Sequence, residues 1–224
     1  MNKGRVVRKR IAGVPASIRK RPRPEEVAEV APQPVSLGAM GVEAEFTVLL
    51  DGQQVKPEDV FKSPTNIVRA PMIHRTGRSY HLPTGGAVYF DTGVIETATG
   101  MFEIDKGCAA RAGRALWENL RFLRGELDEW EKSHGHDVEL AGFSTHYNIS
   151  FTPTQSRRGP ECTVQKLALL LTYILHTPVM LLAANRRSTG IGVRPRGNRV
   201  EVTAGFTPDA SLVIATATLC VGII

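Results

Sequence analysis

Alternating apolar and polar residues predict several β-strands in this chain. Four segments follow the two-residue period in which every second side chain faces the same side of a sheet: residues 41–50, 86–99, 137–151 and 199–205. The dipeptide Asp51-Gly52 after the first segment is typical of a hairpin turn. Residues 86–99 are predicted to form two strands with a bend between them, and residues 189–196 are predicted to pair with 199–205 in a hairpin.

Apolar positions with a period of three to four residues predict helices between the strands. The first helix is predicted to begin with Asp105 as its N-cap, to run to about Ser133 and to end at Gly135. Its apolar face has a 4-3-4-3 spacing, formed by Leu116, Leu120, Leu123, Leu127 and Trp130. A second helix is predicted to start at Thr163, and a third to follow Pro208-Asp209.

The second predicted helix contains an apolar run, residues 167–184, which is barely long enough to span a membrane. His176 and Pro178 lie near its middle, where an ionisable ring is costly in lipid. We therefore predict a buried core helix with a break at the proline. Helices interleaved among mostly antiparallel strands predict the α+β class, with a curved sheet that carries the active site on one face and helices on the other.

The basic residues are concentrated at the N-terminus. The chain has 224 residues and a net charge of +6, and residues 1–35 hold nine Lys/Arg against three Glu, so the remainder is balanced. Residues 1–35 are also rich in proline and are predicted to be a disordered basic arm. The arm either solubilises the protein or docks onto an acidic partner or nucleic acid. Residues 36–224 are predicted to fold as one domain.

The cysteines and the two ends of the chain suggest further expectations. The three cysteines are far apart and have no zinc-site spacing, so we expect reduced thiols in a cytoplasmic protein. The basic start lacks an apolar run, so no signal peptide is expected. The chain stops at Ile224 inside an apolar helical run without a cap. Either the natural protein is longer, or this end docks into a groove or a partner such as a second copy.

Five side chains on the strand-like segments form the candidate metal site: Glu43, Glu45, Glu96, His146 and Glu201. A sheet face with so many carboxylates is poorly suited to a dry core, because buried carboxylates must be paired or bind metal. Oxygen ligands with one imidazole suit Mg²⁺ or Mn²⁺ bound together with a phosphate. Simpler roles stay open: a solvated strand face for the glutamates, a hydrogen-bonded core position for the histidine, and a turn for Asp91 before Thr92-Gly93.

Several motifs resemble the glutamine synthetase and glutamate–cysteine ligase superfamily of carboxylate–amine ligases, and within it the Pup ligase and Pup deamidase branch. The stretches that carry this resemblance are Gly41–Phe46 (GVEAEF), Gly85–Asp91 (GGAVYFD) with Glu96–Thr99 (ETAT), Phe143–Ser150 (FSTHYNIS), Thr172–Asn185 (TYILHTPVMLLAAN) and Asn198–Leu212 (NRVEVTAGFTPDASL). The resemblance covers about residues 38–224 and implies a glutamine-synthetase-like catalytic domain, incomplete at its C-terminus if the natural chain is longer.

The resemblance implies a role for each matching residue. Glu43 and Glu45 would face the metals and the nucleotide phosphates, and Glu96, His146 and Glu201 would complete the metal shells. Arg199 would neutralise the phosphates as a catalytic residue, which suits the geometry of a guanidinium group. The nucleotide-binding set would also include Asn148, Arg187 and Arg194, although an exposed basic loop is the alternative for the arginines. Asp91 matches the aspartate taken as catalytic in the Pup enzymes.

The sequence also departs from the family pattern. Glutamine synthetase has an arginine two residues after the glutamate that matches Glu201, where this chain has Thr203. The Pup enzymes have a longer segment before the Arg-x-Glu strand, and a C-terminal domain. These departures leave open which amine and carboxylate are joined, and in which direction the reaction runs.

Three functions follow as hypotheses. The first is an ATP- and Mg²⁺-dependent ligase that joins a small-molecule, peptide or protein carboxylate to an amine through an acyl phosphate. The second is a nucleotide-requiring amide hydrolase of the Pup deamidase type, in which Asp91 attacks the amide or activates water. The third is a non-catalytic relative that binds a partner through residues 1–35.

Overall fold

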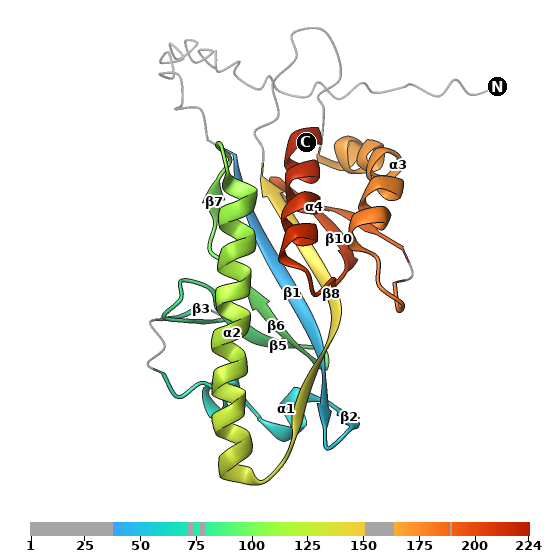
Figure 1. The fold of residues 1–224 in the computed structure, drawn as a ribbon. Helices are drawn as coiled ribbons and strands as arrows, with labels where there is room; N and C mark the ends of the chain where they lie inside the picture. Colours follow the sequence, from blue (N-terminus) through green and yellow to red (C-terminus); the bar gives the residue numbers. More distant parts are fainter. Residues whose placement is uncertain (1–37, 71–73, 77–78, 151–163, 189) are drawn as a thin grey trace, which may run out of the picture. The chain divides into compact units, whose positions relative to one another are not determined.

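A computed structural model of the chain describes residues 38–70, 74–76, 79–150, 164–188 and 190–224. The predicted basic arm lies outside these residues. Figure 1 shows the described elements in chain order. The strands are β1 (Ala39–Leu50), β2 (Gln53–Val55), β3 (His74–Thr76), β4 (Ser79–His81), β5 (Ala87–Asp91), β6 (Val94–Ala98), β7 (Phe102–Glu103), β8 (Val138–Ser150), β9 (Gly192–Arg196) and β10 (Arg199–Gly205). The helices are α1 (Pro57–Val60), a 3-10 turn at Pro64–Asn66, α2 (Cys108–His134), α3 (Val164–Ala183) and α4 (Ala210–Ile223).

The strands form one open sheet of the α+β class, as the alternation predicts. The order along the sheet is β3-β4-β5-β6-β1-β8-β10-β9, and β2 and β7 pair with β1. Each of these pairings is antiparallel. The long strands β1 and β8 cross the centre side by side (Figure 1). The hairpin between β5 and β6 turns at Thr92-Gly93, and the predicted turn at Asp51-Gly52 is confirmed by the positive φ angles of both residues.

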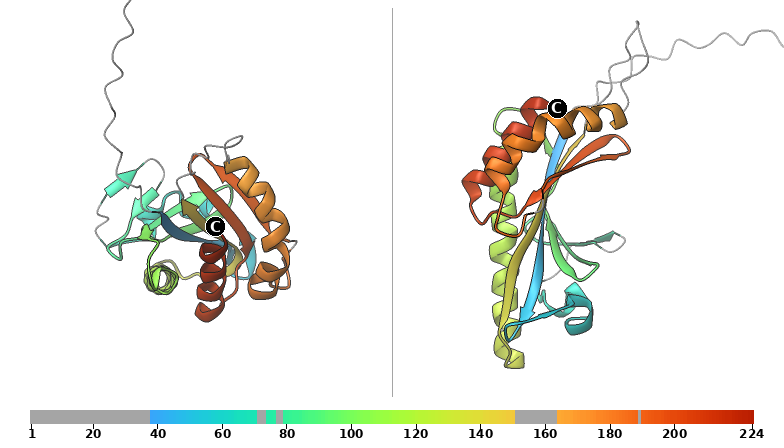
Figure 2. Two further views of the ribbon diagram at one scale, coloured as in Figure 1. Left: turned by 90° about the horizontal axis from the view of Figure 1, so that it is seen from above. Right: turned by 90° about the vertical axis from the view of Figure 1, so that its right-hand side faces the viewer.

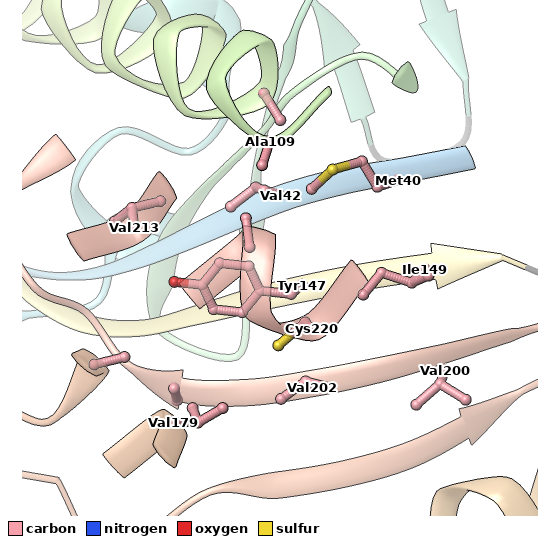
Figure 3. Close-up of a cluster of buried hydrophobic side chains, with 14 of the residues drawn as sticks. Met40, Val42, Ala109, Tyr147, Ile149, Val179, Val200, Val202, Val213 and Cys220 are labelled. Atoms are coloured by element: carbon pink, nitrogen blue, oxygen red, sulfur yellow. The ribbon is translucent and has the colours of Figure 1, made fainter. Parts of the chain in front are cut away.

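Three helices cover one face of the sheet (Figure 2), because the even-numbered residues of β1 from Met40 to Val48 are apolar and buried. Tyr147, Val200 and Val202 extend this apolar layer onto β8 and β10, and Val179, Val213 and Cys220 meet it from α3 and α4 (Figure 3). A second cluster lies under the C-terminal half of α2 and contains Phe61 and Trp130, whose ring centroids are 4.9 Å apart. The opposite face of the sheet is left for polar side chains.

The ends of α2 show one correct and one wrong prediction. Gly135 ends the helix with a φ of 73°, as expected. The N-cap, however, is Gly107 with a φ of 87°, so the helix begins at Cys108 and Asp105 is not the cap. Asp105 instead forms an ion pair with Arg111 in the first turns of the helix. Helix α4 begins as predicted, with the Asp209 carboxylate accepting from the backbone of Ser211 and Leu212.

Helix α3 differs from the prediction in two ways. It continues through Pro178 without a break, because Leu175 before the proline and Val179 after it are both buried and hold the helix in place. It also buries only one face, formed by Val164, Ala168, Leu171, Leu175, Val179 and Ala183. Apolar side chains on its other side are exposed, among them Tyr173 and Leu181. By length and composition α3 is also long and apolar enough to cross a membrane.

Candidate functional site

The strand register brings the predicted polar residues onto one sheet face. Glu96 on β6 lies opposite both Tyr89 on β5 and Glu45 on β1, and Glu45 in turn lies opposite Ser144 on β8. Two residues further along, Glu43 lies opposite His146. Directly opposed residues of antiparallel strands point to the same side. The side chains therefore form two rows across the strands on the face away from the helices.

A cavity of about 740 Å³ lies over these rows. Its walls come from β1, β5, β6, β8, β9, β10 and the segment after α3. They include all but one of the residues singled out from the sequence, namely Glu43, Glu45, Asp91, Glu96, His146, Arg187, Arg194, Arg199 and Glu201. Asn148 lines a neighbouring cavity of about 230 Å³, which also touches Glu43 and Arg199. The fold thus gathers segments that are far apart in sequence around one polar depression.

Glu43, Glu96 and His146 form the tightest group. One ligand atom of each lies within 4.8 Å of the others. His146 Nδ1 is 3.4 Å from Glu43 Oε2, and its Nε2 is 3.6 Å from Glu45 Oε1. Ser144 Oγ hydrogen-bonds to Glu45 and lies 3.1 Å from His146 Nε2. Two carboxylates and an imidazole at this spacing are a donor set that suits a divalent cation.

The proximity of these groups changes their acidity. Burial raises the pKa of Glu96 to about 7, and the charges of Glu43 and Glu45 add to this effect, while a hydrogen bond from Tyr89 opposes it. Burial and the neighbouring carboxylates also raise the pKa of the Tyr89 hydroxyl.

Glu43 and His146 support each other's charged forms. Burial works against both charges, but at Glu43 the contacts with His146 and Asn148 and the charge of Arg199 together outweigh it, and the pKa of Glu43 is lowered. Burial likewise works against the His146 cation, yet Glu43, Glu45 and Glu201 raise the pKa of His146 above its usual value. The cluster carries an excess of negative charge that a cation would neutralise.

Glu201 lies in a different environment from the other acidic residues. Its carboxylate is buried between two arginines of β9: it pairs with Arg194, and Arg196 Nε lies 3.0 Å from its Oε2. Arg194 also donates to Thr203 Oγ1 at 3.2 Å. Arg199 Nε donates to Asn148 Oδ1 at 2.8 Å. Glu201 therefore holds Arg194 and Arg196 in place. Together with Arg199 they form an arginine wall beside the cluster of Glu43, Glu96 and His146.

Asp91 and Arg187 lie at the edges of the cavity, and both are exposed. Asp91 ends β5, and its Oδ1 accepts a hydrogen bond of 3.0 Å from Thr92 Oγ1. It lines the cavity and shapes the hairpin turn at once. The Arg187 backbone N–H donates to Asn185 Oδ1, and Asn185 Nδ2 donates to the Phe206 carbonyl, which ties the segment after α3 to the end of β10.

The wall also contains residues that were not in the predicted site, among them Tyr89, Ser144, Phe143 and Arg196. Tyr89 and Ser144 each lie two residues from a predicted site residue on the same strand, so the two-residue period of a strand predicts that they share its face. Phe143 has no such signal. It sits one residue before Ser144, where strict alternation would turn it toward the helices.

No protein-family model matches the chain, and no curated protein matches it in sequence. Among solved structures, it is similar to the Pup ligase PafA in its complex with the prokaryotic ubiquitin-like protein Pup, with a TM-score of 0.46 and 12% sequence identity. The match covers 84% of this chain and 45% of the ligase chain, so this chain spans less than half the length of that protein. The antiparallel α+β fold is given by the structure of this chain itself, and membership of the carboxylate–amine ligase superfamily stays a prediction.

Proposed function

We propose that the chain is an ATP- and Mg²⁺-dependent ligase that joins a carboxylate to an amine. The observation that carries this proposal is the convergence of Glu43, Glu96 and His146 in one cavity with a wall of arginines. The acidic residues suit a bound cation, and the arginines that face them suit phosphate groups. Together they fit a metal–nucleotide complex.

The donor set fits Mg²⁺ or Mn²⁺. Glu43, Glu96 and His146 would hold the ion, with Glu45 beside them, because their ligand atoms already converge. Glu201 is less suited to this role, since both of its carboxylate oxygens are occupied by Arg194 and Arg196. A bound divalent ion would offset the charge of the β- and γ-phosphates during phosphoryl transfer.

The arginine wall would receive the phosphates. Arg199 is exposed and held through Asn148, so its remaining guanidinium N–H groups are available to phosphate oxygens. Arg194 and Arg196 are held by the buried Glu201 carboxylate, which fixes their position before a ligand arrives. Fixed donors lose less conformational entropy on binding than mobile side chains do.

The reaction would proceed in two steps. An oxygen of the substrate carboxylate attacks the γ-phosphorus of ATP, and the bond to ADP breaks, which gives an acyl phosphate and ADP. The amine nitrogen then attacks the acyl carbon, the bond to phosphate breaks, and a proton leaves the nitrogen. Asp91, exposed at the cavity edge, would accept that proton as a general base.

The position of Asp91 also supports a second candidate, a nucleotide-requiring amide hydrolase. Its carboxylate is exposed at the cavity edge and accepts only a short-range hydrogen bond from Thr92 among the described residues. Such a carboxylate is suited to attack an amide carbon or to activate water. A covalent adduct at Asp91 after incubation with an amide substrate would favour the hydrolase over the ligase.

The proposal is tested by calorimetric titration of ATP into the purified chain, with Mg²⁺ and with chelator. We expect binding that requires the metal and is lost in the Glu43→Gln variant. The matched control is Glu103→Gln, an exposed glutamate on β7 that does not line the cavity. A folded wild-type protein that binds neither MgATP nor MnATP would contradict both enzyme functions.

A further inference from the structure

Phe143 is an exposed aromatic side chain next to the proposed nucleotide site. It is 55% exposed, although the four residues that follow it on the central strand β8 are buried. It lines both the cavity of about 740 Å³ and a second cavity of about 460 Å³. The ring therefore offers an apolar face to a ligand that occupies either cavity, and covering it would remove apolar surface from water.

A β-bulge places Phe143 on this face. Glu45 pairs with Ser144 and Phe46 pairs with Gly142, so Phe143 is the extra residue in β8. Gly142 packs directly against the ring of Phe206, where a Cβ atom would lie 2.3 Å from Cδ1. The Phe206 N–H also donates to the Phe143 carbonyl at 3.2 Å. Core packing thus holds the bulge and aims the Phe143 side chain into the cavity.

The position of Phe143 matches the reach of a nucleotide. His146, in the acidic cluster, is three residues further along β8, which corresponds to about 10 Å of strand. That separation is comparable to the distance between the terminal phosphate and the base of an extended nucleoside triphosphate. With phosphates at the cluster and at Arg199, the base end would therefore fall at Phe143.

The second cavity has the chemistry of a base and ribose site. Its walls include the side chains of Thr47, Gln54, Lys56 and Thr92, which donate and accept hydrogen bonds. Among the described residues that line it, none carries a carboxylate. Such a cavity would accommodate the polar edges of a base whose face lies on the aromatic ring.

We propose that Phe143 is the stacking platform for the base of the bound nucleotide. This inference rests on the proposed function, since it presupposes that the phosphates occupy the acidic and arginine-lined cavity. Phe143 acts as a positioning residue: it contacts the base and sets the affinity for the nucleoside part of the ligand. The metal and phosphate contacts do not depend on it.

The test compares MgATP with magnesium tripolyphosphate, which has the phosphates but no base. Both are titrated calorimetrically into wild type, Phe143→Ala and Phe143→Trp. The matched control is Tyr173→Ala, which removes an exposed aromatic ring from α3, away from both cavities. We expect Phe143→Ala to weaken MgATP binding by about tenfold or more and to leave tripolyphosphate binding unchanged. Phe143→Trp should retain the MgATP affinity, because indole also stacks on a base.

Each other outcome contradicts a defined part of the reasoning. Equal MgATP affinity in wild type and Phe143→Ala would overturn the stacking role and leave the proposed function intact. An equal loss for both ligands would also overturn it, since the variant would then have damaged the phosphate site or the fold. Wild-type protein that binds neither ligand would refute the proposed function itself.

Discussion

Replacing Glu96 by glutamine is expected to stabilise the metal-free protein at neutral and alkaline pH. Glu96 is 3% exposed, and burial together with two nearby carboxylates raises its pKa from 4.5 to about 7. The folded protein therefore pays a free-energy cost when this carboxyl ionises. Glutamine has nearly the same shape and cannot ionise, so it avoids that cost.

The sign and size of the effect follow from the pKa. Because the pKa of Glu96 is higher in the folded than in the unfolded chain, its contribution to stability is fully present below pH 4.5 and is lost as pH rises through about 7. At about 1.4 kcal/mol per pKa unit, the loss above pH 7 amounts to about 3 kcal/mol of unfolding free energy. The raised pKa of His146 acts in the same sense, since its contribution is present below pH 6.5 and is lost above its folded-state pKa. Glu43, with a lowered pKa, loses its contribution only at acidic pH.

Urea denaturation in the presence of a chelator, repeated between about pH 5 and pH 8, measures this dependence. Wild type should lose stability over this range, and Glu96→Gln should lose less, so that it becomes the more stable protein by up to about 3 kcal/mol at the alkaline end. Added Mg²⁺ or Mn²⁺ should restore stability to wild type and not to the variant, because the ion binds the ionised carboxylate. A variant whose stability falls as steeply as that of wild type would refute the reasoning, and Glu103→Gln should follow the wild-type curve.

Three further predictions test the fold and the direction of the chemistry. Gly142→Ala should destabilise the protein by roughly 1–3 kcal/mol, because its Cβ would overlap the aromatic ring behind the bulge; Gly125→Ala, in an open position of α2, should instead stabilise it by about 0.5–1 kcal/mol in the same denaturation assay. In α3, replacing the buried Leu175 by alanine should lower the unfolding free energy by about 2–5 kcal/mol, and replacing the exposed Leu181 by serine should lower it by at most about 0.5 kcal/mol. Equal losses would mean that both faces of the helix are buried. Asp91→Asn should abolish product formation while MgATP binding, measured by calorimetry, persists; lost binding would instead place Asp91 in the nucleotide site.

The sequence alone determined which residues share a face. A strand has a period of exactly two residues, so the spacing of Glu43 and Glu45, or of His146 and Asn148, is enough to place each pair on one side. Turn residues and the cap at Asp209 also act locally, so the hairpins and the start of α4 followed from short motifs. The same local information predicted an antiparallel sheet with helices on its apolar face.

The tertiary structure decided how these faces meet. The pairing of β9 with β10 places Arg194 and Arg196 on Glu201, so this carboxylate lies apart from the cluster of Glu43 and His146. Likewise, which side of α3 is exposed depends on the elements that pack against the helix, and the composition of the helix does not predict that.

Phe143 illustrates the difference most clearly. Alternation along β8 would direct its side chain toward the helices, because Ser144 faces the cavity. The bulge reverses that direction, and it is held by close packing of Gly142 against Phe206, a residue more than sixty positions away in the chain. A local sequence pattern predicts the direction of a side chain only where the strand register is regular. The register at this point is set by contacts between segments that are far apart in the sequence.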